Sequence, residues 1–408
     1  MKRITLTEYR TAQGVALSAE HVSALWAIAS SILISPSSAG QGTYDLTAGS
    51  HVGLIRVGDI AVEIRPKIGV ARLLFLISYA IDPWSWREQE VHFAPHESVV
   101  EAVLPGFLWQ IERAFRQGVL QGYREVEEAA TTVRGRIRFG DQLRRHHGRS
   151  FPVEVRYDDF TVDIELNRLI KAALFGVRRL PLRSASVLHR LRHAEALLGD
   201  VSLVSYDTAN LPQVAFNRLN DRYRAAVELS KLLLRGISYD LGEGGVAAAA
   251  FLVDMNKVFE DFVVVALREA LRLSPRVFPQ GAAGHTLALD SAGRVRLEPD
   301  ISWWDAGRCV FVGDVKYKRS SVMGGLHPDL YQVLAYAVGA DLPEGVLIYA
   351  AGEADPVRHM VPHAAKMLEV MTLDLEASPD EVLSRVGGIA ERVRSMQARA
   401  EGPISRVG

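Results

Sequence analysis

The stretch from residue 297 to residue 317 constrains the fold of this chain more than any other part of its sequence. Its first half alternates apolar and polar residues, which is the pattern of a β-strand with one buried face. Residues 305–308 (Asp-Ala-Gly-Arg) supply a turn. The second half, from Cys309 onward, is apolar on both faces until Asp314 and Lys316, as expected of a central strand. We therefore predict a β-hairpin that ends in polar side chains.

The polar end of this hairpin predicts a metal site. Asp314 and Lys316 point to one side of their strand because strand side chains alternate, and Asp300 reaches the same end from the neighbouring strand. Two carboxylates can hold Mg²⁺, or Mn²⁺ in its place, and such a metal offsets charge on a phosphate under attack and acidifies water. We predict that Asp300 and Asp314 are metal ligands and that Lys316 orients the attacking water. The alternative is a surface salt-bridge cluster.

The length of 408 residues predicts two or three domains. Residues 1–100 are expected to form an α+β domain. Residues 101–245 are expected to form a mainly helical region with a basic strand segment. Residues 246–408 are expected to form an α/β domain followed by C-terminal packing helices, with the glycine-rich loop 241–245 as the boundary before it.

Several individual elements can be predicted from the spacing of apolar residues. Helices are expected at residues 22–34, 73–80 and 104–121. Gly58 and Asp59 provide the turn of a second hairpin. The tail from residue 364 onward is expected to consist of packing helices.

A basic segment lies in the middle region, where residues 111–240 hold 22 Lys and Arg against 16 Asp and Glu. A strand through residues 133–139 would place arginines on one face at intervals of about 7 Å, close to the spacing of phosphates. We predict DNA-backbone contact there, with contact to a protein partner or a solvated face as alternatives. The residues concerned are Arg134, Arg136, Arg138, Arg144 and Arg145.

The sequence also excludes several classes of protein. The single cysteine, Cys309, excludes an intramolecular disulfide framework and a cysteine zinc cluster. No Gly-Lys-Ser or Gly-Lys-Thr occurs, so the chain should not power a nucleotide-driven motor of the phosphate-binding-loop class. The longest lipophilic stretch, residues 73–81, is far shorter than the roughly 20 residues of a membrane helix, and no signal-peptide run precedes it. We expect a cytoplasmic protein without a membrane partner.

The predicted metal site resembles the signature of the PD-(D/E)xK nuclease superfamily. Here a proline precedes Asp300, and Asp314 is followed two residues later by Lys316. The resemblance implies a restriction-endonuclease-like α/β domain that cuts phosphodiester bonds.

Two further features agree with this resemblance. Glu260 lies on the preceding predicted helix, where many members of the superfamily place another metal-directed carboxylate. Gln332 and Tyr336 resemble the QxxxY element of RecB-like nucleases, and residues four apart share one helix face. The resemblance therefore adds Glu260 to the predicted metal ligands and all three to the predicted catalytic residues. Packing or surface roles are the alternatives.

The chain as a whole resembles the McrC family, which provides the nuclease subunit of McrBC modification-dependent restriction systems. The resemblance covers about residues 50 to 340, with Val315 standing where an alanine is frequent. It is carried by residues 55–69 (IRVGDIAVEIRPKIG), 73–80 (LLFLISYA), 134–137 (RGRI), 254–260 (DMNKVFE) and 314–318 (DVKYK).

This resemblance implies a partner, a hexameric AAA+ GTPase of the McrB type that recognises modified DNA such as 5-methylcytosine and uses GTP. In that family the N-terminal part docks onto the motor and the C-terminal part cuts, so GTP would act only through the partner. Two other hypotheses stay open. The chain could be an adaptor that activates the motor and cuts only secondarily, or a RecB-like repair nuclease that cuts alone.

Overall fold

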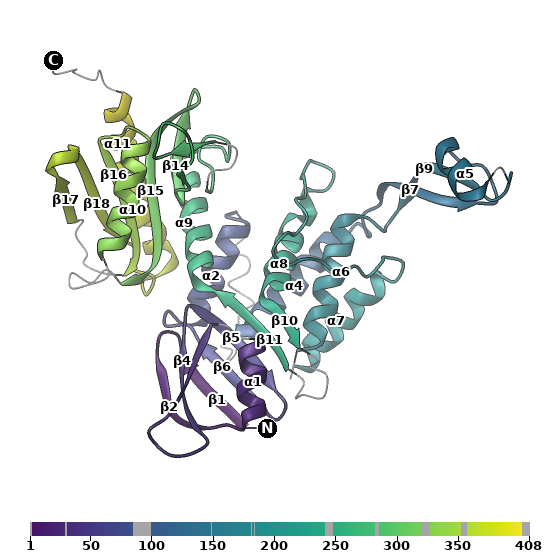
Figure 1. Cartoon of the computed structure of the whole chain (residues 1–408), viewed down its shortest axis with the longest axis horizontal. Helices are drawn as coiled ribbons and strands as arrows, with labels where there is room; N and C mark the ends of the chain where they lie inside the picture. Colours follow the sequence, from purple (N-terminus) through teal and green to yellow (C-terminus); the bar gives the residue numbers. More distant parts are fainter. Residues whose placement is uncertain are drawn as a thin grey trace.

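Two β-sheets at opposite ends of one long helix organise the chain, and a helical body with a projecting arm stands beside them (Figure 1). The predicted boundary loop 241–245 lies outside the described residues. The computed structural model describes residues 2–28, 31–84, 99–147, 149–180, 182, 184–240, 248–281, 285–319, 326–351 and 357–401.

A five-stranded sheet forms one end of the molecule, in the order β1-β6-β5-β11-β10. The hairpin predicted around Gly58 is confirmed, because β5 and β6 pair antiparallel across it. β11 follows the predicted domain boundary but pairs with β5, so the chain completes the N-terminal sheet before it enters the C-terminal domain. The strands are β1 (Lys2–Thr7), β5 (His51–Val57), β6 (Ile60–Arg65), β10 (Ile237–Asp240) and β11 (Ala248–Asp254).

A small sheet in the order β2-β4-β3 and a helix complete this end. The helix predicted at residues 22–34 is wrong over its last residues, which form a strand. Ile32 and Ile34 are buried whereas Leu33 between them is exposed, and this period of two fits a strand. The elements are β2 (Thr11–Ala16), α1 (Ala19–Ile28), β3 (Ile32–Pro36) and β4 (Thr43–Ala48).

A helical body occupies the middle of the chain and confirms the helices predicted at residues 73–80 and 104–121, although the second begins earlier and ends at Phe115. None of the helices among the described residues is long and apolar enough to cross a membrane. The helices are α2 (Val70–Ile81), α4 (Val99–Phe115), α6 (Glu165–Arg178), α7 (Ala185–Leu197), the 3₁₀ turn η1 (Asp221–Tyr223) and α8 (Arg224–Gly236).

An arm projects from this body and points away from the C-terminal sheet (Figure 1). It is a long antiparallel pair, β7 with β9, and it carries one short strand and one short helix. The strand predicted through residues 133–139 forms only at Arg136 and Ile137, because a helix begins at Phe139. The elements are β7 (Gly122–Ala130), β8 (Arg136–Ile137), α5 (Phe139–His146) and β9 (Val153–Thr161).

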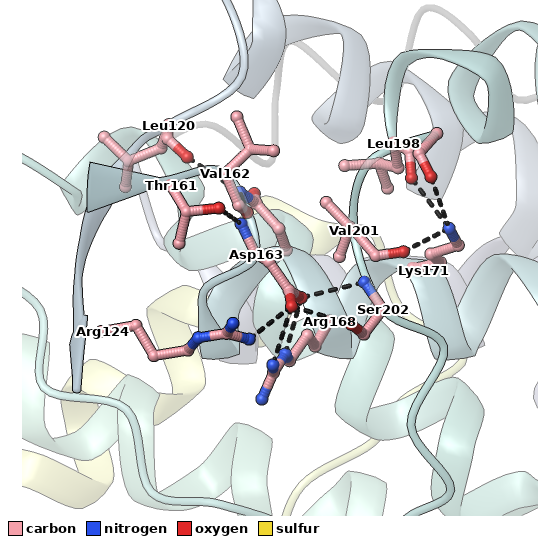
Figure 2. A network of polar contacts seen from close by, with 12 residues as sticks. Leu120, Arg124, Thr161, Val162, Asp163, Arg168, Lys171, Leu198, Val201 and Ser202 are labelled. Carbon is pink, nitrogen blue, oxygen red and sulfur yellow. Dashed lines mark hydrogen bonds and ion pairs between the residues drawn. The ribbon is translucent and has the colours of Figure 1, made fainter. Parts of the chain in front are cut away.

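The base of the arm is fastened to the helical body by a buried carboxylate (Figure 2). Asp163 accepts hydrogen bonds from Arg124 on β7, at 2.5 Å, and from Arg168 on α6, at 2.7 and 2.8 Å. It also accepts from the main-chain N–H and the hydroxyl of Ser202, at 2.9 and 2.8 Å. One side chain therefore joins the arm to two parts of the body.

The other end of the molecule is a five-stranded sheet in the order β14-β15-β16-β18-β17. The predicted hairpin is confirmed: β14 and β15 pair antiparallel, and Ala306 and Gly307 have φ of 46° and 81°, as a two-residue turn of the primed type requires. The strands are β14 (Ile301–Asp305), β15 (Arg308–Arg319), β16 (Glu344–Ala351), β17 (Val357–Val361) and β18 (Lys366–Thr372), beside a short pair, β12 (Leu287–Ala288) and β13 (Arg296–Leu297).

Helices cover both faces of this sheet. α9 (Met255–Leu271) and α11 (Pro379–Glu401) contact one face of β15, and α10 (Leu326–Gly339) contacts the other. The prediction that the tail from residue 364 is only helical is wrong. Its first part is β18, because Leu368 and Val370 fill the α10 side of the sheet while Met371 fills the α9 side.

Candidate active site

Asp300, Asp314 and Lys316 meet at the end of the hairpin, as the sequence predicts. Along β15, Val315 and Tyr317 belong to the core under α9, so the alternate residues Asp314 and Lys316 face α10. Asp300 stands just before β14, and its Oδ2 accepts a hydrogen bond of 2.9 Å from the main-chain N–H of Val315. The main chain of β15 thus holds the second carboxylate beside the first.

The Lys316 ammonium lies between the two carboxylates. Its Nζ is 2.6 Å from Asp314 Oδ2 and 3.6 Å from Asp300 Oδ2. Burial works to lower the pKa of Lys316, but the close contact with the Asp314 carboxylate and its charge, and then the charge of Asp300, outweigh burial and raise that pKa. Lys316 is therefore held as a cation, which can orient water or a phosphate oxygen but cannot take up a proton.

Asp314 is the most confined group of the three, because its side chain is 0% exposed. Neither carboxylate oxygen has a hydrogen-bond partner among the described residues, so the contact to Lys316 is an ion pair without hydrogen-bond geometry. Burial and then the charge of Asp300 raise the pKa of Asp314 to about 7. A buried carboxylate with an unpartnered oxygen is costly unless a cation compensates it.

The donor set therefore fits a divalent cation with oxygen ligands. Asp314 offers the unpartnered Oδ1, and Asp300 offers its second oxygen nearby. Among the described residues no group of three or more His, Cys, Asp or Glu side chains is arranged to hold a metal. The carboxylates that stand together here and could take part in holding one are those of Asp300 and Asp314. The remaining ligands of a hard cation would be water and a phosphate oxygen, as is usual for Mg²⁺.

Gln332 and Tyr336 lie on α10 and close this side of the site. Gln332 Nε2 donates to Tyr336 Oη at 2.7 Å, and Tyr336 Oη donates to the carbonyl oxygen of Glu298 at 3.0 Å. Burial and then the charge of Asp314 raise the pKa of Tyr336. The pair therefore stands close enough to Asp314 to feel its charge, and it ties α10 to the segment that leads into Asp300.

Two residues of this surrounding were missed by the sequence analysis. Tyr349 is paired with Lys316 across β15 and β16, and its hydroxyl donates to Asp329 Oδ2 at 2.5 Å. Asp329 lies three residues before Gln332, on the same face of α10. That spacing is a signal that sequence reasoning could have used, but only the pairing of β15 with β16 brings Tyr349 beside Lys316.

Glu260 occupies a different position from the aspartate pair. It lies on α9, under the opposite face of the sheet, and its Oε1 accepts from Lys257 Nζ and Gln280 Nε2, both at 2.9 Å. Gln280 is bridged to Ile301, the residue after Asp300. Glu260 is thus linked to the site through one side chain, and its role as a metal ligand stays a prediction.

The five arginines predicted to contact DNA all lie on the arm, remote from the aspartate pair (Figure 1). Arg138 is paired with Glu127 and Asp141, Arg144 with Asp141, and Arg145 with Glu154. Arg134 is paired with Asp159 at 3.4 Å, and Arg136 lines an open cavity of about 650 Å³ with Arg138 and Arg156. DNA contact by these side chains stays a prediction, and most of their charge is balanced within the arm.

Comparison with known proteins gives one family match. The model of the McrBC 5-methylcytosine restriction system component family matches residues 46–350. A search of curated proteins gave no match.

Two solved structures match this chain, and the first of them is similar in fold. One is described as a refined half-complex from the tetradecameric assembly of Thermococcus gammatolerans McrB AAA+ hexamers with bound McrC. Its matching chain is 17% identical with a TM-score of 0.55, over 96% of this chain and 100% of that chain. The second, a cryo-electron-microscopy structure of the Thermococcus gammatolerans McrBC complex, is 20% identical with a TM-score of 0.42, over 66% of this chain and 88% of that one.

Proposed function

Because this chain belongs to the family of McrBC 5-methylcytosine restriction system components, we propose that it is the Mg²⁺-dependent DNA endonuclease subunit of such a system. The observation that carries the proposal is the fully buried Asp314, whose unpartnered oxygen stands beside Asp300 and the Lys316 ammonium. A salt-bridge cluster serving only stability would instead satisfy its buried oxygens.

Each residue has a role that follows from its position. Asp314 and Asp300 would hold the cation, which when bound supplies charge to offset that of the phosphate and to acidify water. Lys316, kept protonated by the two carboxylates, orients the attacking water against the phosphate. Gln332 and Tyr336 shape the wall of the site, since their hydrogen bonds fix α10 against the main chain at Glu298. Glu260, on α9 at the opposite face of the sheet, assists through its hydrogen bond with Gln280.

The test is plasmid cleavage by the full chain with Mg²⁺, GTP and its AAA+ partner, beside calorimetric binding of Mn²⁺. We expect Asp314→Asn and Lys316→Ala to lose at least about 100-fold in cleavage rate. Asp314→Asn should also bind Mn²⁺ at least about 100-fold more weakly, since even indirect changes around a metal cost 10 to 100-fold.

Asp305→Asn is the matched control, because Asp305 is an exposed carboxylate at the turn of the same hairpin. Full cutting by Asp314→Asn, or Mn²⁺ binding as tight as in the unmutated chain, contradicts the proposal. Robust cutting by the isolated chain without any motor would favour the stand-alone repair nuclease.

The second candidate function is activation of a partner AAA+ hexamer, with cutting secondary. It is favoured by the arm, which projects away from the candidate site (Figure 1). The arm also exposes large apolar side chains in an otherwise charged element. Exposed apolar groups gathered on one element indicate a protein contact. They are Tyr123, Val133, Phe139, Leu143, Phe151 and Phe160.

This candidate is tested by the GTP hydrolysis of the partner. If activation is the main role, Phe139→Ser with Leu143→Ser should abolish the stimulation of hydrolysis by the full chain, and Asp314→Asn should keep it. Loss of stimulation in Asp314→Asn as well would argue against separate roles for the arm and the site.

A further inference from the structure

A buried polar contact joins the first strand of the chain to the strand that carries the candidate site. Tyr317 Oη on β15 donates a hydrogen bond of 2.8 Å to Glu8 Oε1, directly after β1. Glu8 is 0% exposed and Tyr317 is 6% exposed. The two residues are 309 positions apart, so the contact exists only because the N-terminal sheet and the C-terminal sheet approach each other here.

Glu8 is held firmly by the N-terminal sheet. Its Oε1 also accepts a hydrogen bond of 2.7 Å from the main-chain N–H of Lys67, and its own N–H donates to the carbonyl of Arg65 at 3.1 Å. β1 pairs in parallel with β6 up to Thr7 and Arg65, so these contacts continue directly from the paired strands. The position of the carboxylate is therefore set by two main-chain segments.

Tyr317 stands where β15 loses its regular neighbours. Pairing with β14 ends at Gly313, and pairing with β16 is regular up to Lys316 and resumes only at Arg319. The Tyr317 ring packs against Phe259 of α9, with ring centroids 5.9 Å apart. The hydrogen bond to Glu8 thus anchors the strand one residue after Lys316, where the regular pairing of β15 with its neighbouring strands is interrupted.

We propose that Glu8 is a positioning residue for Lys316, which it acts on through Tyr317 and the end of β15. Consecutive residues of a strand share one extended backbone, so a shift of Tyr317 moves the Lys316 ammonium away from Asp314 and Asp300. The N-terminal sheet then helps to set the geometry of the site. The catalytic part of this inference rests on the proposed nuclease function, whereas the structural link does not.

The link is tested first without catalysis, by hydrogen–deuterium exchange of the full chain. We expect Tyr317→Phe and Glu8→Ala to raise exchange of the amides at residues 314–317 about tenfold, with β18 unchanged. Glu8→Gln should stay close to the unmutated chain, because its amide oxygen can accept the same two hydrogen bonds. Tyr223→Phe is the matched control, since it removes a buried hydroxyl that accepts from the Leu120 N–H at 2.7 Å in the helical body.

Catalysis is the second readout, with the AAA+ partner, Mg²⁺ and GTP. Tyr317→Phe should lower kcat about tenfold, with KM for DNA and Mn²⁺ binding within about twofold, because the ligands stay in place. Unchanged exchange at residues 314–317, an equal rise throughout β16 and β18, or an unchanged kcat overturns the proposal. If the unmutated chain cuts no DNA at all, the nuclease function fails while the exchange result still decides the link.

Discussion

Asp163 and Asp314 are both buried aspartates, at 6% and 0% exposed, but their surroundings are opposite. Asp163, at the base of the arm, accepts hydrogen bonds from two arginines and from Ser202 (Figure 2). The hydrogen bonds of Arg168 hold the pKa of Asp163 far below its usual range. Asp314 has one lysine, a second carboxylate beside it and no hydrogen bond among the described residues, and burial raises its pKa.

The difference separates a structural carboxylate from one prepared for a ligand. The protein itself compensates the charge of Asp163, so nothing from outside is needed and the side chain can fasten the arm. The protein compensates Asp314 only in part, and it adds the charge of Asp300. A carboxylate of this kind lowers the stability of the metal-free chain, and the binding of a cation raises that stability again.

The largest expected effect on stability comes from removing Asp163, the carboxylate whose charge the protein itself compensates. Asp163→Ala should lower the free energy of unfolding by roughly 3 kcal/mol, because it leaves Arg124 and Arg168 partly buried without their partner. Urea unfolding of the full chain measures this loss. Asp305→Ala, at an exposed position, should change it by less than about 0.5 kcal/mol. A loss at Asp163 no larger than at Asp305 would remove the distinction between the two carboxylates.

The pH dependence of stability should differ in sign between the two groups. The folded pKa of Asp314 lies above its ordinary 3.8, at about 7, so its contribution to stability is fully present below pH 4 and is lost as pH rises through 7. The folded pKa of Asp163 is lowered, so its contribution is present above pH 4 and is lost as pH falls further.

Unfolding of the metal-free chain between pH 4.5 and pH 8 tests the Asp314 part. Asp314→Asn should flatten the decrease, and Asp163→Asn should leave it in place. Mn²⁺ affinity should fall about tenfold for each pH unit below 7, because a proton must leave Asp314 before the cation binds. The raised pKa of Asp314 is contradicted if the metal-free chain becomes more stable from pH 5 to pH 8 and Asp314→Asn removes that rise.

The smallest effect is expected at the wall of the site. Tyr336→Phe removes the hydroxyl that joins Gln332 to the carbonyl of Glu298, and it should lower the free energy of unfolding by about 1 kcal/mol. Thermal unfolding checks it against Tyr123→Phe, an exposed tyrosine of the arm. If Tyr336→Phe leaves both stability and cleavage unaltered, α10 does not support the site through this residue.

The sequence predicts local features well where one physical cause dominates. The turn at Gly307, the alternation along β15 and the meeting of Asp314 with Lys316 follow from backbone sterics and strand geometry alone. Prediction was wrong where a short apolar run fits both helix and strand, as at Ile32 and in the tail before α11. There the choice depends on which neighbouring strands are available to pair.

The sequence by itself determined the hairpin, the interior position of β15 and the set of polar residues at its end, because these depend on neighbours within about twenty positions. Only the tertiary structure decided that β11 completes the N-terminal sheet, that Tyr349 and Asp329 stand beside Lys316, and that Glu8 anchors Tyr317. The reason is physical. A buried hydrogen bond between residues hundreds of positions apart leaves no periodic trace in either segment, so it becomes visible only when both are packed together.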